Sequence, residues 1–280
     1  MPPRKKNRED FKRLEGARVV KANELIQKTS FHLTLQAQKT LLFLLSQITP
    51  ETEVFTEMEF SVSDFARSCG IEADGGRIYQ EVKKTLYELH RCEILYYGSP
   101  WIPLENGWEA PLHWIEKPYA SAKRGRIRIR FDRDMVPFLL HLRERFTEYE
   151  LIWTLQFKSG YSVRLYEYLK SRHFDKLHPY EFTVDLAELR ERCGAENYTR
   201  WPDFNRRVLR VAVAEINDAA DMTVEAAPVT EKNRVTAVHF KIETKERMEY
   251  LRLYSALETA YGADQLSMFD PAPPAGDPQP

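Results

Sequence analysis

Apolar residues recur at helical spacing in four segments of the chain, two in each half. The four predicted helices span residues 33–48, 76–91, 161–172 and 201–218. Strand-like segments 222–229 and 234–244 follow the last helix, separated by a polar turn that ends at Asn233. The repeated segment described below adds a short strand and a helix between the two helices of each half. Each half is therefore predicted to contain a helix, a short strand, two further helices and a hairpin, which is the order of a winged helix-turn-helix.

An internal repeat supports the same division. The segment EFSVSDFARSCG, Glu59 to Gly70, recurs as EFTVDLAELRERCG, Glu181 to Gly194, with two extra residues in the second copy. The fold class that we predict is α+β, with two tandem winged helix-turn-helix domains and disordered N- and C-terminal tails. Two unrelated α+β segments that share a short motif are the competing explanation.

Both copies of the repeat contain signals for a helix start and a helix end. After a strand that ends at the valine, Ser63 or Asp185 is predicted to cap the following helix. Gly70 and Gly194 are predicted to adopt the left-handed conformation that ends it. The preceding cysteines, Cys69 and Cys193, are interpreted as small buried groups.

Helix 201–218 is the third helix of the second predicted domain, and it separates apolar from basic side chains. A helical wheel at about 100° per residue directs Phe204, Val208, Leu209, Val211, Ala212, Val213 and Ile216 inward. The same wheel directs Asp203, Arg206, Arg207, Arg210 and Asn217 outward. In a helix-turn-helix this helix enters the major groove, where arginine can bind guanine or a phosphate. A solvated face paired with acids is the alternative.

Other segments carry candidate DNA contacts in addition to helix 201–218. They are Arg77, Gln80, Lys83 and Lys84 on helix 76–91; Lys158, Ser159, Ser162 and Arg164 near a helix start; and Lys232, Asn233 and Arg234 at the wing tip. The strand KRGRIRIRF, with Arg124, Arg126, Arg128 and Arg130, is either a phosphate-binding strand or a solvated or dimer-pairing strand.

Composition and charge narrow the class of protein. The chain is 43% hydrophobic and 30% charged, with a net charge of −1. Residues 1–21 are strongly basic, which suits either a DNA-contacting arm or a solvated end. No apolar run approaches the roughly 20 residues that span a bilayer, and neither a signal segment nor a CxxC pair is present. We therefore expect a cytoplasmic protein without membrane association.

Sequence motifs of enzymes are absent. The chain has no GxxxxGK, HxH or HExxH. We therefore predict a protein that is not an enzyme, has no catalytic residues and needs no cofactor or metal. A nicking initiator enzyme and a two-domain transcription repressor without a replication role are the rival interpretations.

Several long motifs resemble one family. KANELIQKTSFHLTLQAQKTLLFLLSQI, KSGYSVRLYEYLK, YEFTVDLAELRERCG and YTRWPDFNRRVLRVAVAEIN are similar to segments of the iteron-binding plasmid replication initiators (the Rep family of theta-type replication), over about residues 20–245. The resemblance implies binding to repeated double-stranded origin sites, control of plasmid copy number and origin opening with host initiator and replicative helicase. It also implies a monomer–dimer equilibrium in which dimers repress their own gene.

The resemblance and the pattern together give four segments. They are a basic flexible arm, 1–21; a first winged-helix domain for dimerisation and secondary DNA contact, 22–145; a second for the main sequence-specific binding, 146–250; and a helix end with a disordered tail, 251–280. Residues 97–123 match nothing in the family and are interpreted as an insertion in the first wing.

The tail contains a short hydrophobic motif. Gln265, Leu266, Met268 and Phe269 resemble the pentapeptide that binds the replicative sliding clamp, with Met268 where leucine is usual. The alternative is a terminal segment that packs back onto its own domain.

Overall fold

The computed structural model describes residues 17–71, 77–104, 111–173, 178–246, 249, 251–253 and 255. The clamp-like motif at 265–269 and most of the basic arm lie outside these residues.

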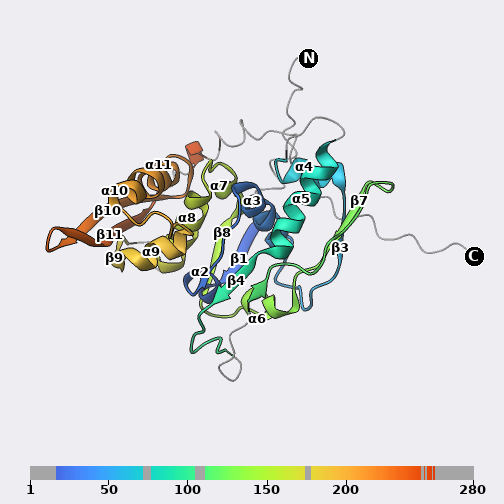
Figure 1. Cartoon of the computed structure of the whole chain (residues 1–280), viewed down its shortest axis with the longest axis horizontal. Helices are drawn as coiled ribbons and strands as arrows, with labels where there is room; N and C mark the ends of the chain where they lie inside the picture. Colours follow the sequence, from blue (N-terminus) through green and yellow to red (C-terminus); the bar gives the residue numbers. More distant parts are fainter. Residues whose placement is uncertain are drawn as a thin grey trace, which may run out of the picture.

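The second half of the chain forms a winged helix, which lies to the left in Figure 1. Its elements are α8 (Gly160–Arg172), β9 (Tyr180–Asp185), α9 (Leu186–Cys193), α10 (Trp201–Phe204), the π-helical segment η4 (Asn205–Leu209), α11 (Arg210–Ala219), β10 (Met222–Glu231) and β11 (Arg234–Thr244). The antiparallel sheet has the order β10-β11-β9. Helix, strand, two helices and hairpin follow one another as the sequence predicted.

The first half repeats this topology on the right of Figure 1. Its elements are α3 (Leu35–Leu45), β3 (Met58–Ser61), α4 (Val62–Ser68), α5 (Ile78–Arg91), β6 (Tyr119–Ser121) and β7 (Arg126–Ile129). The sheet order β3-β7-β6 matches β9-β11-β10 of the other half. The tandem winged-helix prediction is confirmed.

Further elements join or extend the two winged helices. They are β1 (Arg18–Ala22), α2 (Asn23–Gln27), β2 (Thr29–Ser30), β4 (Glu93–Tyr96), β5 (Leu112–His113), η3 (Arg133–Met135), α6 (Val136–Leu139), β8 (Phe146–Glu150) and α7 (Leu151–Leu155). Strand β1 pairs antiparallel with β8, so the predicted boundary between residues 145 and 146 passes through a shared structural unit.

The insertion begins earlier and ends earlier than predicted. Strands β4 and β5 form a separate sheet with β2, whereas β6, within the predicted range 97–123, is a strand of the wing itself. Trp114 is fully buried and packs edge-on against Phe31, with ring centroids 5.0 Å apart. Part of the inserted segment is therefore core.

The predicted helix signals are right in three of four places. Asp185 Oδ1 accepts hydrogen bonds from the amides of Ala187 and Glu188, and Gly70 and Gly194 have φ of 62° and 64°. The cap of α4, however, is Ser61 and not Ser63, because β3 ends one residue before the valine and the helix begins at that valine.

All three cysteines are buried, in agreement with the prediction for the two that end helices. Burial raises the pKa of the Cys193 thiol to about 12 and that of Cys92 to about 11. It also raises the pKa of the Cys69 thiol, against a hydrogen bond with Thr40 that acts in the opposite direction. These groups are protonated at neutral pH.

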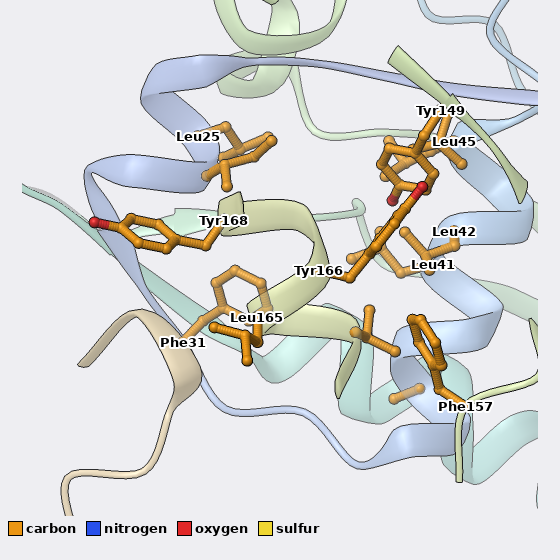
Figure 2. Packing of buried hydrophobic residues seen from close by; sticks show 14 of the residues in the cluster. Leu25, Phe31, Leu41, Leu42, Leu45, Tyr149, Phe157, Leu165, Tyr166 and Tyr168 are labelled. Carbon is orange, nitrogen blue, oxygen red and sulfur yellow. The ribbon is translucent and has the colours of Figure 1, made fainter. Parts of the chain in front are cut away.

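Helix α8 occupies the centre of the molecule (Figure 1), and every side chain from Ser162 to Leu169 is buried. Figure 2 shows Leu165, Tyr166 and Tyr168 of α8 among residues from the first half, including Phe31 and Leu41. Tyr149 packs edge-on against Tyr166 with ring centroids 5.3 Å apart. One apolar core therefore runs through both winged helices and holds them together.

A buried ion pair lies within this shared core. The ammonium of Lys21 on β1 contacts the Glu167 carboxylate of α8, and each side chain is 3% exposed. The Tyr149 hydroxyl donates to the same carboxylate oxygen. The prediction that the flexible arm extends to residue 21 is therefore wrong at its end, since residues 18–21 form β1 and Lys21 is needed inside the fold.

Candidate nucleic-acid interface

The continuous helix formed by α10, η4 and α11 presents an arginine surface to solvent. Arg206, Arg207 and Arg210 are exposed, while Phe204 and Val208 are buried beneath them. Arg206 pairs with Asp203 at 3.4 Å, a contact that solvent weakens because the Arg206 side chain is 68% exposed. Among the described residues, Arg207 and Arg210 have no hydrogen-bond or ion-pair partner. Their donors are open to an external acceptor.

The π-helical segment changes which side chains face outward. A π-helix closes i→i+5 hydrogen bonds, so each of its residues turns by less than in an α-helix. Residues after η4 are therefore rotated relative to a regular helical wheel. Val211, predicted to face the core, is 37% exposed. The prediction for Val211 is wrong because the wheel assumed one period throughout.

Asn217 belongs to the scaffold. Its side-chain Nδ2 donates to the Val224 carbonyl at 2.9 Å, and its Oδ1 accepts from the Val224 amide at 2.7 Å. The Lys245 ammonium contacts the Asn217 carbonyl. These bonds attach the end of α11 to β10, so the Asn217 side chain is not free to bind DNA, contrary to the prediction.

The second wing ends in an exposed basic turn. Lys232 and Asn233 have φ of 47° and 64°, as a two-residue type I′ hairpin turn requires. Lys232, Asn233 and Arg234 are all exposed. The structure thus places the three predicted wing residues together at the end of a long two-stranded hairpin.

The first winged helix offers a second polar helix surface on α5. Arg77, Gln80 and Lys84 are exposed, and Lys83 is half-buried with its ammonium 5.7 Å from the centre of the Tyr87 ring. Lys84 lies 3.7 Å from Glu81. Val82, Leu86 and Leu89, on the other side of the helix, are buried.

The predicted phosphate clamp at the start of α8 is largely internal. The Glu215 carboxylate accepts hydrogen bonds from the amides of Lys158 and Ser159, at 3.1 and 3.2 Å, and so occupies the position that an anion would take. Ser159 Oγ caps the helix by accepting from the Tyr161 amide. Lys158 is exposed and remains a candidate contact.

Ser162 and Arg164 are corrected more strongly, because α8 lies between the two winged helices. Ser162 is fully buried. The Arg164 side chain donates from Nε to the Arg192 carbonyl at 2.9 Å, and its guanidinium carbon lies 3.8 Å from the centre of the Phe31 ring. Both residues are buried and not accessible to DNA, and Arg164 joins α8 to the Arg192 carbonyl and to Phe31.

Three of the four arginines predicted on the first wing, Arg126, Arg128 and Arg130, are paired with acids. Arg128 lies 3.0 Å from Glu57, and Arg130 lies 2.5 Å from Glu116. Arg126 approaches Glu59 at 3.8 Å. These contacts favour the solvated-strand interpretation over the phosphate-binding one.

The described part of the chain lacks two features that mark other protein classes. It contains no group of three or more His, Cys, Asp or Glu placed to hold a metal ion. Within those same ranges, no helix is long and apolar enough to cross a membrane.

Comparisons with known families and proteins agree with this architecture. The family described as "Initiator Replication protein, WH1" matches residues 18–170, and "Initiator Rep protein, WH2" matches residues 185–242. A replication initiation protein of Escherichia coli is 26% identical over 238 residues, which cover 82% of this chain and 71% of that protein. The PI protein of Escherichia coli is 25% identical over 153 residues, covering 49% of this chain and 50% of its own.

A solved structure gives the same fold. The crystal structure of the Pi initiator protein in complex with iteron DNA aligns with a TM-score of 0.64 at 20% identity, covering 82% of this chain and 98% of that chain. Its likeness supports the two-winged-helix architecture. The family matches and this alignment cover both halves of the molecule.

Proposed function

Because the chain belongs to the initiator replication protein family, we propose that it starts replication of a plasmid by binding repeated double-stranded sites in the origin. Its relative of known structure was crystallised with iteron DNA. The family membership favours this role over that of a transcription repressor without a part in replication.

The observation that carries the proposal is the arginine surface of the second winged helix. Arg207 and Arg210 extend from the helix that enters the major groove in this fold, and no described residue neutralises them. Beside this helix, the hairpin ends in exposed Lys232 and Arg234. A helix and a wing with free basic groups suit base contacts flanked by phosphate contacts.

The first winged helix is proposed to make the secondary contact, through α5. Exposed Gln80 can bind adenine with two hydrogen bonds, and Arg77 and Lys84 can approach phosphates. Because one core joins the two winged helices, both helices are proposed to enter grooves about one helical turn, 34–36 Å, apart. Specificity then includes the spacing between the two half-sites.

A gel-shift series on the origin repeats tests this proposal. We expect Arg207→Ala and Arg210→Ala each to reduce specific binding by about 1–3 kcal/mol where the arginine contacts a base. A phosphate contact would instead weaken all sequences alike and reduce the slope of log affinity against log salt by about 0.9. Arg133→Ala, which removes an exposed arginine of η3, is the matched control and should bind normally. Normal binding by both helix variants would refute the proposed interface.

The proposed dimerisation and the proposed host partners are inferred from the family resemblance. Dimers formed through the first domain would repress the chain's own gene, while monomers would act with host initiator and replicative helicase in the cytoplasm. Gln265, Leu266, Met268 and Phe269 are proposed to bind the sliding clamp. A tail peptide should bind purified clamp, and Leu266→Ala with Phe269→Ala should abolish that binding; unchanged binding would eliminate this site.

The same proposal assigns no nicking chemistry to the protein. Incubation with supercoiled plasmid that carries the repeats, in the presence of Mg²⁺, is expected to leave the plasmid intact. A nicked product that requires Mg²⁺ would contradict this and favour a nicking initiator.

A further inference from the structure

An apolar side chain interrupts the arginine surface of α11, and no internal packing explains it fully. Val211 is 37% exposed, more than any other valine of α10, η4 or α11. It follows Arg210 directly and lies four residues after Arg207, which places Val211 and Arg207 side by side on the helix. Exposed Ala214 is the next residue on this face.

The periodicity of α11 (Arg210–Ala219) produces this arrangement. Ala212 and Ile216 are fully buried, and at about 100° per residue Val211 lies about 100° from Ala212 and about 140° from Ile216. Val211 therefore faces outward, on the side of the helix that carries the arginines. The helix that faces DNA in the proposed function therefore exposes a branched apolar side chain to solvent.

In the major groove, one base carries an apolar group at its edge. The C5-methyl group of thymine distinguishes T·A from the other pairs and accepts apolar contacts. We propose that Val211 recognises a thymine methyl group and so determines one position of the binding site, an inference that rests on the proposed function. Ala214 leaves room beside it for the base to approach.

The spacing along the helix limits where that thymine can lie. Val211 is four residues from Arg207, a rise of about 6 Å, while neighbouring base pairs are about 3.4 Å apart. The thymine should therefore lie within about two base pairs of the guanine or phosphate that Arg207 contacts.

The test removes the methyl group alone. The full-length chain selects a duplex from a random library, and each thymine of that duplex is replaced singly by deoxyuridine. At one position we expect the wild-type affinity to fall about fourfold, which corresponds to about 0.8 kcal/mol for one buried methyl-sized group. Val211→Ala should bind the thymine duplex about fourfold more weakly and show no further loss with deoxyuridine there.

Two controls separate this contact from other effects. Val54→Ala shortens another exposed valine, 65% exposed and in the first half of the chain, and should retain the full deoxyuridine effect. The Val211→Ala variant should unfold at the wild-type temperature, since the side chain is partly solvated. Deoxyuridine effects that are the same in Val211→Ala and wild type, or absent at every thymine, would overturn the inference. A chain that selects no duplex would overturn the proposed function itself.

Discussion

Replacing Glu167 by glutamine should show how much the two winged helices depend on their shared core. Glu167 lies on α8 and contacts Lys21 of β1, and both side chains are 3% exposed. Glutamine keeps the size of the side chain and an oxygen that can accept from the Tyr149 hydroxyl. The substitution therefore removes mainly the negative charge that balances a buried ammonium.

The expected loss of stability is large because Lys21 has no route to solvent. Breaking a buried pair by removing one partner typically costs about 3–5 kcal/mol. Glu148→Gln is the matched control, because it breaks the Arg18–Glu148 pair of the same two-stranded unit, where the side chains are 57% and 36% exposed. That exposed pair should contribute no more than about 1 kcal/mol.

The loss of stability in Glu167→Gln relative to wild type should also depend on pH, and the pKa of Lys21 sets the direction of that dependence. Burial lowers this pKa and Glu167 opposes the shift, so Glu167→Gln lowers it further. The unfolded chain still holds the lysine proton up to its ordinary pKa of 10.5. Between the two pKa values the unfolded state binds more protons, so stability rises with pH, and the window is wider in the variant. The difference from wild type should shrink between pH 7 and pH 10.

Urea denaturation followed by circular dichroism measures these differences. The double variant Lys21→Met/Glu167→Leu removes both charges and should recover most of the stability lost in Glu167→Gln. If Glu167→Gln were no less stable than Glu148→Gln, or if its deficit grew with rising pH, the idea that this pair balances a buried charge would be wrong.

Three further predictions concern the caps, the thiols and the spacing of the sites. Asp185→Ala and Ser61→Ala should each lower the free energy of unfolding by about 0.5–2 kcal/mol, whereas Ser63→Ala should change it by less than about 0.5 kcal/mol in the same urea assay. The Cys193 thiol has a pKa raised to about 12 in the folded state, whereas the same thiol in the unfolded chain ionises near 9. The free energy of unfolding should therefore fall as pH rises above 9, by up to about 1.4 kcal/mol per pH unit. Cys193→Ala should remove this contribution to the pH dependence of stability. Inserting about five base pairs between the two half-sites turns one by half a helical turn, and titration should then give the affinity of one winged helix alone.

The sequence was informative wherever a signal is local. Asp185 and Gly194 have the chemistry of a cap and a left-handed end, and the repeat predicted the same topology twice. Ser63 failed as a cap because Ser61, two residues earlier, carries the same hydroxyl and lies where β3 ends. A choice between two equivalent caps depends on the strand register, which pairs Ser61 with Arg126.

The wrong predictions at the candidate site come from contacts between different helices and strands. Arg164 looked like a phosphate ligand, yet Phe31 and the Arg192 carbonyl surround it because α8 is covered from both sides. The helical wheel places Asn217 outward, but its side-chain amide forms two hydrogen bonds with the backbone of Val224. Phe31 and Arg192 are far from Arg164 in the sequence, and Val224 lies on the strand that follows the helix of Asn217, so a wheel of one helix could not identify these contacts.

The buried helix α8 links the stability of the fold to the proposed recognition of DNA. It packs beside α11, which carries Arg210 and continues η4 with Arg207, and it also contacts Lys21 of β1. In a protein with two loosely linked DNA-binding domains, each domain could bind independently and tolerate changes in site spacing. Here one core joins the two winged helices, so weakening the Lys21–Glu167 pair should relax spacing discrimination before it affects the proposed contact of Arg207 with DNA. Glu167→Gln measured on duplexes of normal and altered spacing, at a temperature where it remains folded, would separate these effects. Equal losses on both duplexes would show that the junction does not set the spacing.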